Sequence, residues 1–319
     1  MTLLDIARIL TKNNEFMLIS HTAPDGDTLG SALALRWALL SLGKNAIALC
    51  DCEDVPKHLR ILPGIEAVNT TPIIPKEGTV AIAVDCADIQ RMNKMANVFA
   101  MCSTRVMIDH HISNEGFGDV FCVRKDACAT GEIMFDLIEL LGVPMDVNIA
   151  ICLYAAVATD TGNFTNSNTT PKAFSIAQSA LIAGLPLWQT SHALFRIKSI
   201  ERVRLIALAI DNVRLLQNGA VALSVVTQEE AKQKSANLTD SESVIDVLRD
   251  IDGVEVAVLA RETAENEFRV SFRSCKVDVA EIAARYGGGG HVRASGCEMR
   301  MGADELAQEI LTALGVNEG

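Results

Sequence analysis

The chain has 319 residues, of which 49% are hydrophobic and 21% charged, which excludes a disordered protein and allows one large domain or two ordinary ones. Its 28 Lys and Arg against 40 Asp and Glu give a net charge of −12, the wrong sign for holding long nucleic acid through its phosphates. No apolar run reaches the roughly 18 residues of a membrane span, and the N-terminus lacks a basic segment followed by an apolar one. We therefore expect a cytosolic globular protein without a membrane partner.

The nine cysteines form no CxxC pair, and several lie inside apolar runs. Such residues behave as small core side chains and indicate reduced thiols in a reducing compartment. Cys50 and Cys52 are the only close pair, and no second pair completes a zinc site. A structural zinc site is therefore not expected.

The first part of the chain predicts an α/β domain over residues 1–185. Short apolar runs alternate with stretches of helical period through residue 182, which is typical of a mostly parallel sheet with flanking helices. Strands are predicted at 16–20, 45–49, 80–84 and 106–108, and helices at 31–42, 130–141 and 148–159.

The second part predicts a helical connector over 186–219 and a smaller α+β domain over 220–319, with a cleft between the two domains. Its predicted elements are a connector helix at 199–213, strands at 221–226, 254–259 and 267–273, and a helix at 243–250. The polar stretch 228–242 is predicted to be a mobile surface segment.

Acidic and imidazole side chains follow three of the predicted strands, and Asp160 ends a fourth element that could reach the same edge. Open α/β sheets bind ligands at the carboxyl ends of their strands, so we expect these side chains to converge. The set comprises His21, Asp25, Asp27, Asp85, Asp109, His110, His111 and Asp160.

Taken singly, these residues have plainer explanations. Asp25 and Asp27 could form a turn and cap a helix, Asp85 could cap the next segment, and Asp160 beside a glycine could end a helix. A pair of histidines could lie in a polar loop. The coincidence of all of them at one sheet edge favours a shared site.

Five carboxylates and three imidazoles in one place would destabilise each other unless cations were bound among them. Oxygen and imidazole ligands without a thiolate favour manganese, with magnesium, iron or cobalt as alternatives. The set is large enough for two ions that share a carboxylate and a water about 3.5 to 4 Å apart. Such a site generates hydroxide near neutral pH and promotes in-line attack on phosphorus.

These segments resemble the four successive motifs of the DHH phosphoesterase superfamily. The motifs are His21-x-x-Pro-Asp25-Gly-Asp27, Val84-Asp85-x-x-Asp88, Asp109-His110-His111 and Thr159-Asp160-Thr161-Gly162. The segment from Gly287 to Gly296 is similar to the signature of the DHH-associated domain. Within the superfamily the chain most resembles the bacterial nanoRNase and 3'-phosphoadenosine-5'-phosphate (pAp) phosphatase group.

The resemblance implies a role for each motif residue. One metal would be held by His21, Asp25 and Asp85, and the other by Asp27, Asp85, His110 and Asp160, so that Asp85 bridges the two ions. His111 would contact the scissile phosphate and help to protonate the leaving oxygen, and Asp109 would orient its neighbours. Cys86 and the pair Ala156-Val157 depart from the usual pattern without touching a ligand.

The glycine run 287–290 leaves two readings open. It could be a cradle for a phosphate or ribose, or a helix stop followed by a loop. Arg273 could bind a phosphate through two hydrogen bonds or be an ordinary surface arginine. The candidate substrate residues are Ser271, Arg273, Gly288, Gly289, Gly290 and His291.

The expected function is that of a Mn²⁺-dependent phosphodiesterase, an exoribonuclease that cuts short oligonucleotides and linear dinucleotides such as pApA or pGpG to mononucleotides from the 5' end. Removal of the 3'-phosphate of pAp is expected at the same site. Aromatic residues make up only 4% of the chain, so a long row of base-stacking platforms and a long duplex partner are not expected. A homodimer is compatible with the sequence. The alternatives are an inorganic pyrophosphatase, a cyclic-dinucleotide phosphodiesterase and a non-catalytic nucleotide-binding protein.

Overall fold

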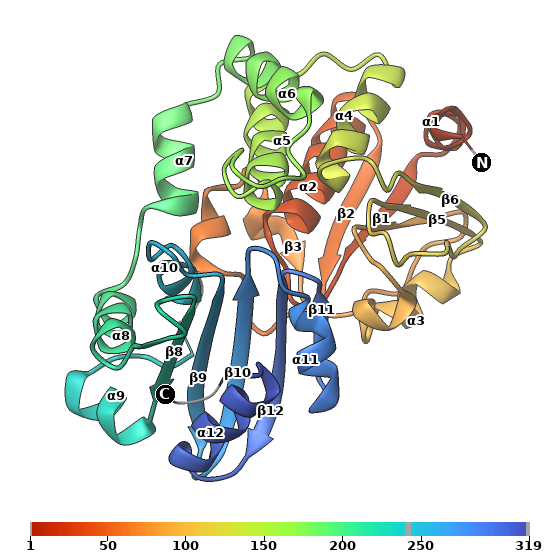
Figure 1. Ribbon diagram of the computed structural model, residues 1–319. Helices are drawn as coiled ribbons and strands as arrows, with labels where there is room; N and C mark the ends of the chain where they lie inside the picture. Colours follow the sequence, from red (N-terminus) through yellow and green to blue (C-terminus); the bar gives the residue numbers. More distant parts are fainter. Residues whose placement is uncertain (1, 240–243, 317–319) are drawn as a thin grey trace. The chain divides into compact units, whose positions relative to one another are not determined.

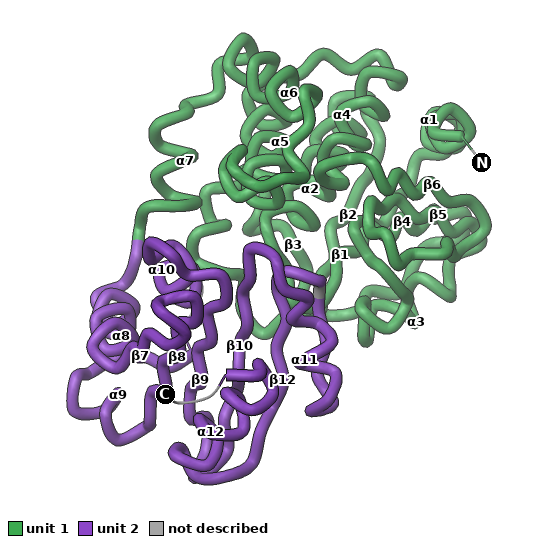
Figure 2. The backbone as a smooth tube through the Cα atoms, viewed as in Figure 1, with its two compact units in different colours: residues 1–197 green, residues 198–319 purple. Residues whose placement is uncertain are grey.

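A computed structural model describes residues 2–239 and 244–316 of the chain. The chain forms two compact units, residues 1–197 and 198–319 (Figure 2). The division falls inside the stretch 186–219 that was predicted to be a connector, and places one of its helices in each unit.

Unit 1 is built on a six-stranded parallel sheet with the strand order β3-β2-β1-β4-β5-β6 (Figure 1). The predicted parallel sheet is confirmed, with two further strands. Because β1 lies between β2 and β4, the chain changes direction across the sheet at β1, the kind of switch point at which open sheets bind ligands. The strands are β1 Glu15–Ser20, β2 Asn45–Cys50, β3 Val68–Asn69, β4 Val80–Val84, β5 Thr104–Asp109 and β6 Val120–Val123.

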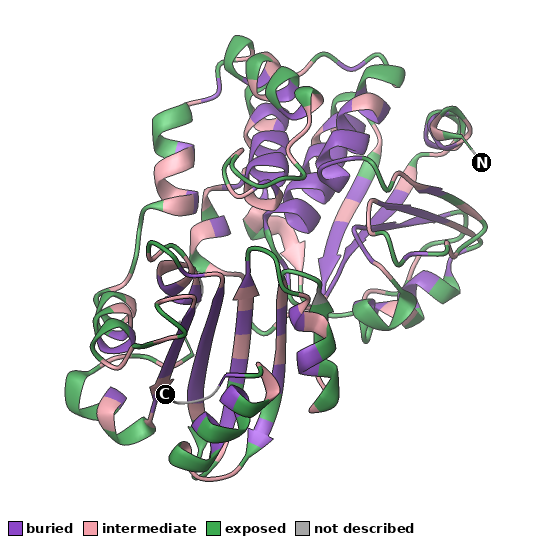
Figure 3. Ribbon diagram, in the orientation of Figure 1, coloured by how far each residue is buried: buried purple, intermediate pink, exposed green. Residues whose placement is uncertain are grey.

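Helices cover both faces of this sheet, because strand residues alternate between two apolar cores. Phe16 and Leu18 of β1 pack into the core beneath α2, α4 and α5, whereas Met17 and Ile19 pack into the core beneath α3. Figure 3 shows α2 and α5 buried over most of their length. The helices are α1 Leu3–Lys12, α2 Gly26–Ser41, α3 Met95–Met101, α4 Thr130–Leu140, α5 Val147–Asp160, α6 Pro171–Ile182 and α7 Leu187–Phe195, with short 3₁₀ turns at η1 Lys57–Ile61, η2 Ile65–Ala67 and η3 Ile89–Met92.

The close packing of α2 against α5 depends on small residues. A Cβ on Gly26 would lie 2.3 Å from Oγ1 of Thr159, and one on Gly30 would lie 2.5 Å from the carbonyl oxygen of Cys152. The helix predicted at 31–42 begins earlier in the structure, at Gly26, directly after its cap Asp25. This early start brings the capping loop to the carboxyl end of β1.

Unit 2 has a six-stranded mixed sheet with the order β11-β12-β10-β9-β8-β7. Only β8 and β9 pair in parallel. Its strands are β7 Arg214–Leu216, β8 Val221–Val226, β9 Val256–Ala264, β10 Glu267–Ser274, β11 Gly289–His291 and β12 Ala294–Arg300. Its helices are α8 Ile200–Asp211, α9 Gln228–Lys234, α10 Val244–Arg249, α11 Val279–Arg285 and α12 Ala303–Ala313. The expected smaller α+β domain is confirmed.

Residues 228–234 of the segment that was predicted to be mobile form helix α9. Thr227 caps this helix, and the side chain of Glu230 accepts a hydrogen bond from the backbone N–H of Thr227, so two helix-end groups are satisfied reciprocally. The polar composition that suggested a loop is that of a short surface helix. Residues 240–243 of the predicted segment lie outside the described residues.

The glycine run begins as a helix stop. The N–H of Gly288 donates to the carbonyl of Ala283 and that of Gly287 to Ala284, with Gly287 at φ 72°, the hydrogen-bond pattern of a Schellman cap. A Cβ on Gly288 would lie 2.2 Å from the carbonyl oxygen of Gly296. This glycine is therefore required for packing, and the following residues enter strand β11.

Candidate active site

Five elements of unit 1, namely β1, β4, β5, α2 and α5, bring the predicted acidic and imidazole side chains to one edge of the sheet. His21 follows β1, Asp85 follows β4, and His110 and His111 follow β5, while Asp160 is the last residue of α5. Parallel pairing aligns the ends of β4 and β5, because Val84 lies opposite Ile108. The predicted convergence is therefore observed within unit 1.

Asp25 is both a helix cap and a member of this cluster. One of its oxygens, Oδ1, accepts hydrogen bonds from the N–H groups of Asp27 and Thr28, each at 3.0 Å. Its other oxygen, Oδ2, lies 3.7 Å from Nε2 of His21. Asp25 is therefore a helix cap whose second oxygen is left facing the cluster, which keeps both explanations of this residue open.

Asp85 is fixed by its backbone and by a neighbouring hydroxyl. Its φ of 58° is in the left-handed region, which a residue with a Cβ rarely adopts. Its N–H still donates to the carbonyl of Ile108, and Oγ1 of Thr130 donates to its Oδ1 at 2.9 Å. The carboxylate is thereby held in one orientation.

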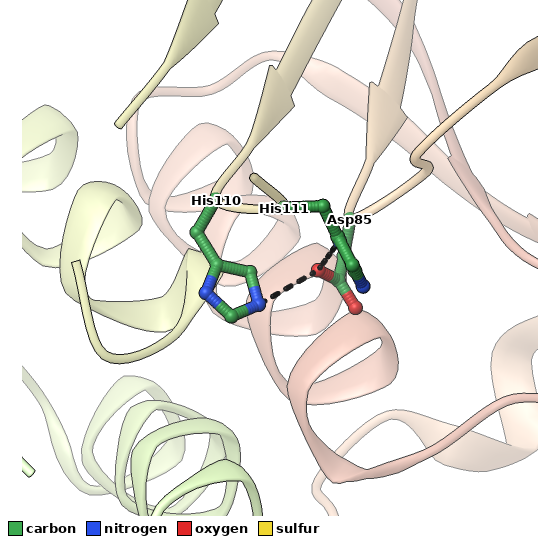
Figure 4. A group of neighbouring side chains, drawn as sticks. All are labelled: Asp85, His110 and His111. Atoms are coloured by element: carbon green, nitrogen blue, oxygen red, sulfur yellow. Dashed lines mark ion pairs between the residues drawn. The ribbon is translucent and has the colours of Figure 1, made fainter. Parts of the chain in front are cut away.

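The two oxygens of Asp85 face different histidines. Oδ2 lies 3.5 Å from Nε2 of His21, whereas Oδ1 lies 3.7 Å from Nε2 of His110 and 3.6 Å from Nδ1 of His111 (Figure 4). These separations are too long for hydrogen bonds. They suit atoms that surround a common cation.

Three sets of ligand atoms lie close enough to hold an ion. In each set the candidate nitrogen and oxygen atoms lie within 4.8 Å of one another. Nε2 of His110 is 3.8 Å from Asp27 and 3.6 Å from Asp160. The sets are His21, Asp25 and Asp85; Asp27, His110 and Asp160; and Asp85, His110 and His111.

The cluster carries negative charge that the protein does not fully compensate. Burial and the neighbouring charges of Asp27 and Asp25 raise the pKa of Asp85 well above its usual range. Burial together with Asp160 raises the pKa of Asp27 to about 7, and burial raises that of Asp160 to about 6 despite His110. These carboxyl groups would be ionised readily only beside a cation.

The donor set fits divalent cations. It consists of carboxylate oxygens and imidazole nitrogens, and the nearby thiols of Cys50 and Cys86 point to backbone carbonyls instead. His21 is only 2% exposed, and its Nδ1 has no hydrogen-bond partner among the described residues. The imidazole is thus held in the cluster without being satisfied by the protein alone.

A second feature of the site is a buried Asp–His pair. Nδ1 of His111 lies 2.7 Å from Oδ1 of Asp109, and Nδ2 of Asn114 donates to the other oxygen of Asp109 at 2.6 Å. Burial alone would raise the pKa of Asp109, but the hydrogen bonds from His111 and Asn114 lower it to about 2. Asp109 is therefore a fixed anion that orients the His111 ring.

Sequence reasoning missed three groups that hold the cluster in place. The N–H groups of Thr130 and Gly131 donate to the two oxygens of Asp27 at 2.7 and 2.9 Å, and Asn114 supports Asp109. Thr130 begins a predicted helix, whose N–H groups need acceptors, but the sequence does not say which ones. Asn114 lies three residues after His111 in a loop, and the sequence does not indicate that its side chain binds Asp109.

The candidate substrate residues lie in unit 2. Ser271 of β10 pairs with Gly296 of β12, which in turn pairs with Gly289 of β11. Nε of Arg273 lies 3.6 Å from Asp246, and its Nη1 donates to the carbonyl of Phe272. The candidate substrate residues therefore lie on neighbouring strands of the sheet of unit 2. The backbone of His291 belongs to β11.

Comparisons with known proteins match both units. Residues 15–157 match the N-terminal domain of the DHH family, and residues 218–315 match the DHHA1 domain. The bifunctional oligoribonuclease and PAP phosphatase NrnA of Thermus thermophilus is 31% identical over 93% of this chain and 88% of its own length. The chain belongs to the DHH family. The resemblance inferred from the four motifs is confirmed.

Other DHH family members agree with this result. NrnA of Bacillus subtilis is 25% identical over 92% of both chains. The crystal structure of an exopolyphosphatase-related protein from Bacteroides fragilis superposes with a TM-score of 0.91 at 26% identity, over 98% of this chain and 95% of the other. The expectation of a hydrolytic phosphoesterase is therefore confirmed. Among the residues described, no helix combines the length and the apolar character needed to cross a membrane.

Proposed function

We propose that this chain is a metal-dependent phosphodiesterase that hydrolyses short oligonucleotides to mononucleotides and removes the 3'-phosphate of pAp. The observation that carries the proposal is the set of ligand atoms around Asp85, in a chain 31% identical to an oligoribonuclease and PAP phosphatase. Linear dinucleotides are the expected substrates, and the cytosol is the expected location.

Two divalent cations, with Mn²⁺ preferred, would be bound at the cluster. His21, Asp25 and Asp85 would hold one, and Asp27, Asp85, His110 and Asp160 the other. One oxygen of Asp85 lies near His21 and the other lies near His110, which supports the role of Asp85 as the shared ligand. Bound cations would supply an activated water and neutralise charge on the phosphate.

The Asp109–His111 pair would deliver a proton to the leaving oxygen. Oδ1 of Asp109 lies 2.7 Å from Nδ1 of His111 and would keep the ring in one orientation, and the hydrogen bond from Asn114 would hold the carboxylate in place. Thr130 would hold Asp85 in position through the hydrogen bond to Oδ1. The protein's own part in the reaction is thus to orient ligands and to place one proton.

Unit 2 would hold the remainder of the substrate. Ser271, Arg273 and the backbone of the glycine run 288–290 offer hydroxyl, guanidinium and N–H donors of the kind that bind phosphate and ribose. His291 is proposed to belong to the same group. A short substrate would need no larger surface than this.

The test is a chromatographic time course of the purified protein with pApA, pAp and pyrophosphate as separate substrates in Mn²⁺, with EDTA as a control. We expect AMP from both nucleotides and no product in EDTA. The variant Asp119→Asn is a matched control, because it removes a carboxylate of unit 1 that pairs with Arg105 near the start of β5, at the end of the strand opposite to the cluster. Turnover of pyrophosphate without turnover of pApA would contradict the proposal.

A further inference from the structure

A buried guanidinium that forms no ion pair with the described residues lies in unit 2, on the face of the sheet that packs against α8, α9 and α10. Arg261 of β9 is only 7% exposed. Its Nη1 donates to the carbonyl of Leu238, and its buried Nε has no hydrogen-bond partner among the described residues. A buried guanidinium without an anion is unfavourable, because its charge has lost water and gained little in return.

Within residues 2–239 and 244–316, the strand neighbours of Arg261 do not neutralise its charge. Strand pairing places Val226 of β8 on one side and Arg269 of β10 on the other. Burial and the charge of Arg269 together lower the pKa of Arg261 to about 10. Two arginines that lie side by side in this way repel each other.

Two described carboxylates lie on the strands near Arg261, those of Glu262 and Glu298. Glu262 follows Arg261 in the chain but pairs with Phe268 on the opposite face, and its oxygens accept the N–H groups of Gln228 and Asn266. Glu298 of β12 lies opposite Arg269, on the side of β10 that faces away from Arg261 and β9. In the described part of the chain, neither forms an ion pair with Arg261.

We propose that Arg261 and Arg269 form an anion subsite that binds one phosphate group of a nucleotide. Guanidinium groups present planar, paired donors that match phosphate oxygens, and a bound dianion would offset both charges. Ser271 and Arg273 continue along the same face of β10, at intervals of about 6.8 Å for alternate strand residues. The binding of a phosphate group is inferred from the residues of unit 2 alone. That this phosphate belongs to a nucleotide rests on the proposed function.

The first test measures binding without catalysis. Inorganic phosphate and AMP are titrated calorimetrically into the full-length protein in EDTA and low salt. Arg269 is exposed and has no partner among the described residues, so Arg269→Ala should fold, and we expect it to weaken phosphate binding about tenfold or more. Arg261→Lys keeps the charge but loses the paired donors, and a similar loss is expected.

Matched controls show whether the effect is specific to these two arginines. Lys276→Ala removes one positive charge from unit 2, where Lys276 pairs with Glu255, and should change the affinity less than twofold. Binding that is lost in Arg273→Ala but unchanged in Arg269→Ala and Arg261→Lys would overturn the subsite. Equal loss in Lys276→Ala would overturn it too, because only net charge would then matter.

The second test identifies the source of the phosphate. If it belongs to the substrate, Arg269→Ala should raise KM for a 5'-phosphorylated trinucleotide more than for the dinucleotide, and leave kcat unchanged. If phosphate binding is lost while both KM values stay unchanged, the subsite takes free phosphate or a mononucleotide. Absence of hydrolysis in the wild type would refute the proposed function while leaving the calorimetric result intact.

Discussion

The sheet edge of unit 1 and the sheet face of unit 2 both bury charge, but with opposite signs. In unit 1, carboxylates gather where parallel strands end, and burial raises the pKa of Asp85 and Asp27. In unit 2, two arginines lie side by side in the middle of paired strands, and burial lowers the pKa of Arg261. Each unit is thus suited to a partner of opposite charge, for which we propose cations in unit 1 and phosphate in unit 2.

The largest expected effect is at Asp85, the carboxylate that the two proposed metal sites would share. Asp85→Asn removes a negative charge and one metal-binding oxygen while it keeps the size of the side chain. We expect kcat on pApA to fall by about 10³-fold or more, on the scale of losing a transition-state electrostatic group. Asp119→Asn, assayed in parallel, should stay near wild type, because Asp119 pairs with Arg105 outside the cluster. Equal loss in both variants would remove Asp85 from its central role.

A smaller effect is expected at Asn114, which positions Asp109 without touching the ligand sets. Asn114→Ala leaves Oδ2 of Asp109 unsatisfied and lets the His111 ring turn, so kcat should fall by about 10- to 100-fold while KM changes little. Mn²⁺ affinity should be retained, because no ligand is altered. A purely structural role would instead lower thermal stability and leave kcat of the folded fraction unchanged.

The pH dependence of stability tests the acidic cluster of unit 1. In the metal-free protein the folded-state pKa of Asp27 is raised to about 7, and Asp27, Asp160 and Asp85 raise that of His110 to about 9 despite its burial. Both groups therefore bind protons more tightly in the folded state, so the stability they contribute is lost as the pH rises through these values.

The measurement is a series of thermal melts between pH 6 and 9. In EDTA we expect the Tm to fall by several degrees across this range, and Mn²⁺ should flatten the dependence by taking the place of the protons. His110→Asn should reduce the slope in EDTA. A Tm in EDTA that rises with pH would contradict the account of an acidic, uncompensated cluster.

The smallest effect concerns the glycine run of unit 2. Gly288→Ala would place a Cβ 2.2 Å from a backbone oxygen of β12, so we expect a loss of about 1–3 kcal/mol in the free energy of unfolding. Gly289→Ala is the matched control, because nothing lies within 4 Å of its Cβ position. Denaturant melts that show equal stability for the two variants would contradict the packing role of Gly288.

Much of the fold could be predicted because the strands carry strong local signals. The buried run 80–84 was predicted with the bounds that β4 has, and the positions of His21 and Asp85 followed from the rule that parallel strands end at one edge. Helix α2 began earlier than predicted, since its start depends on Asp25 as cap and on Gly26 packing against α5, which is a contact distant in sequence.

The supporting groups of the site could not be predicted for the same reason. Thr130 reaches Asp85 across 45 residues of chain, and Gly131 reaches Asp27 across 104. Neither pairing leaves a local pattern in the sequence. Arg261 was also missed, because a lone arginine in a strand does not reveal that its guanidinium will be buried beside a second one.

The measurement that tests the central claim most directly is the Mn²⁺ stoichiometry of the metal-free protein, determined calorimetrically and by electron paramagnetic resonance. We expect two Mn²⁺ ions per chain, coupled to each other in the wild type, with the coupling lost in Asp85→Asn and kept in Asp119→Asn. A wild-type protein that binds no Mn²⁺, or an Asp85→Asn variant that binds two coupled ions as before, would contradict it.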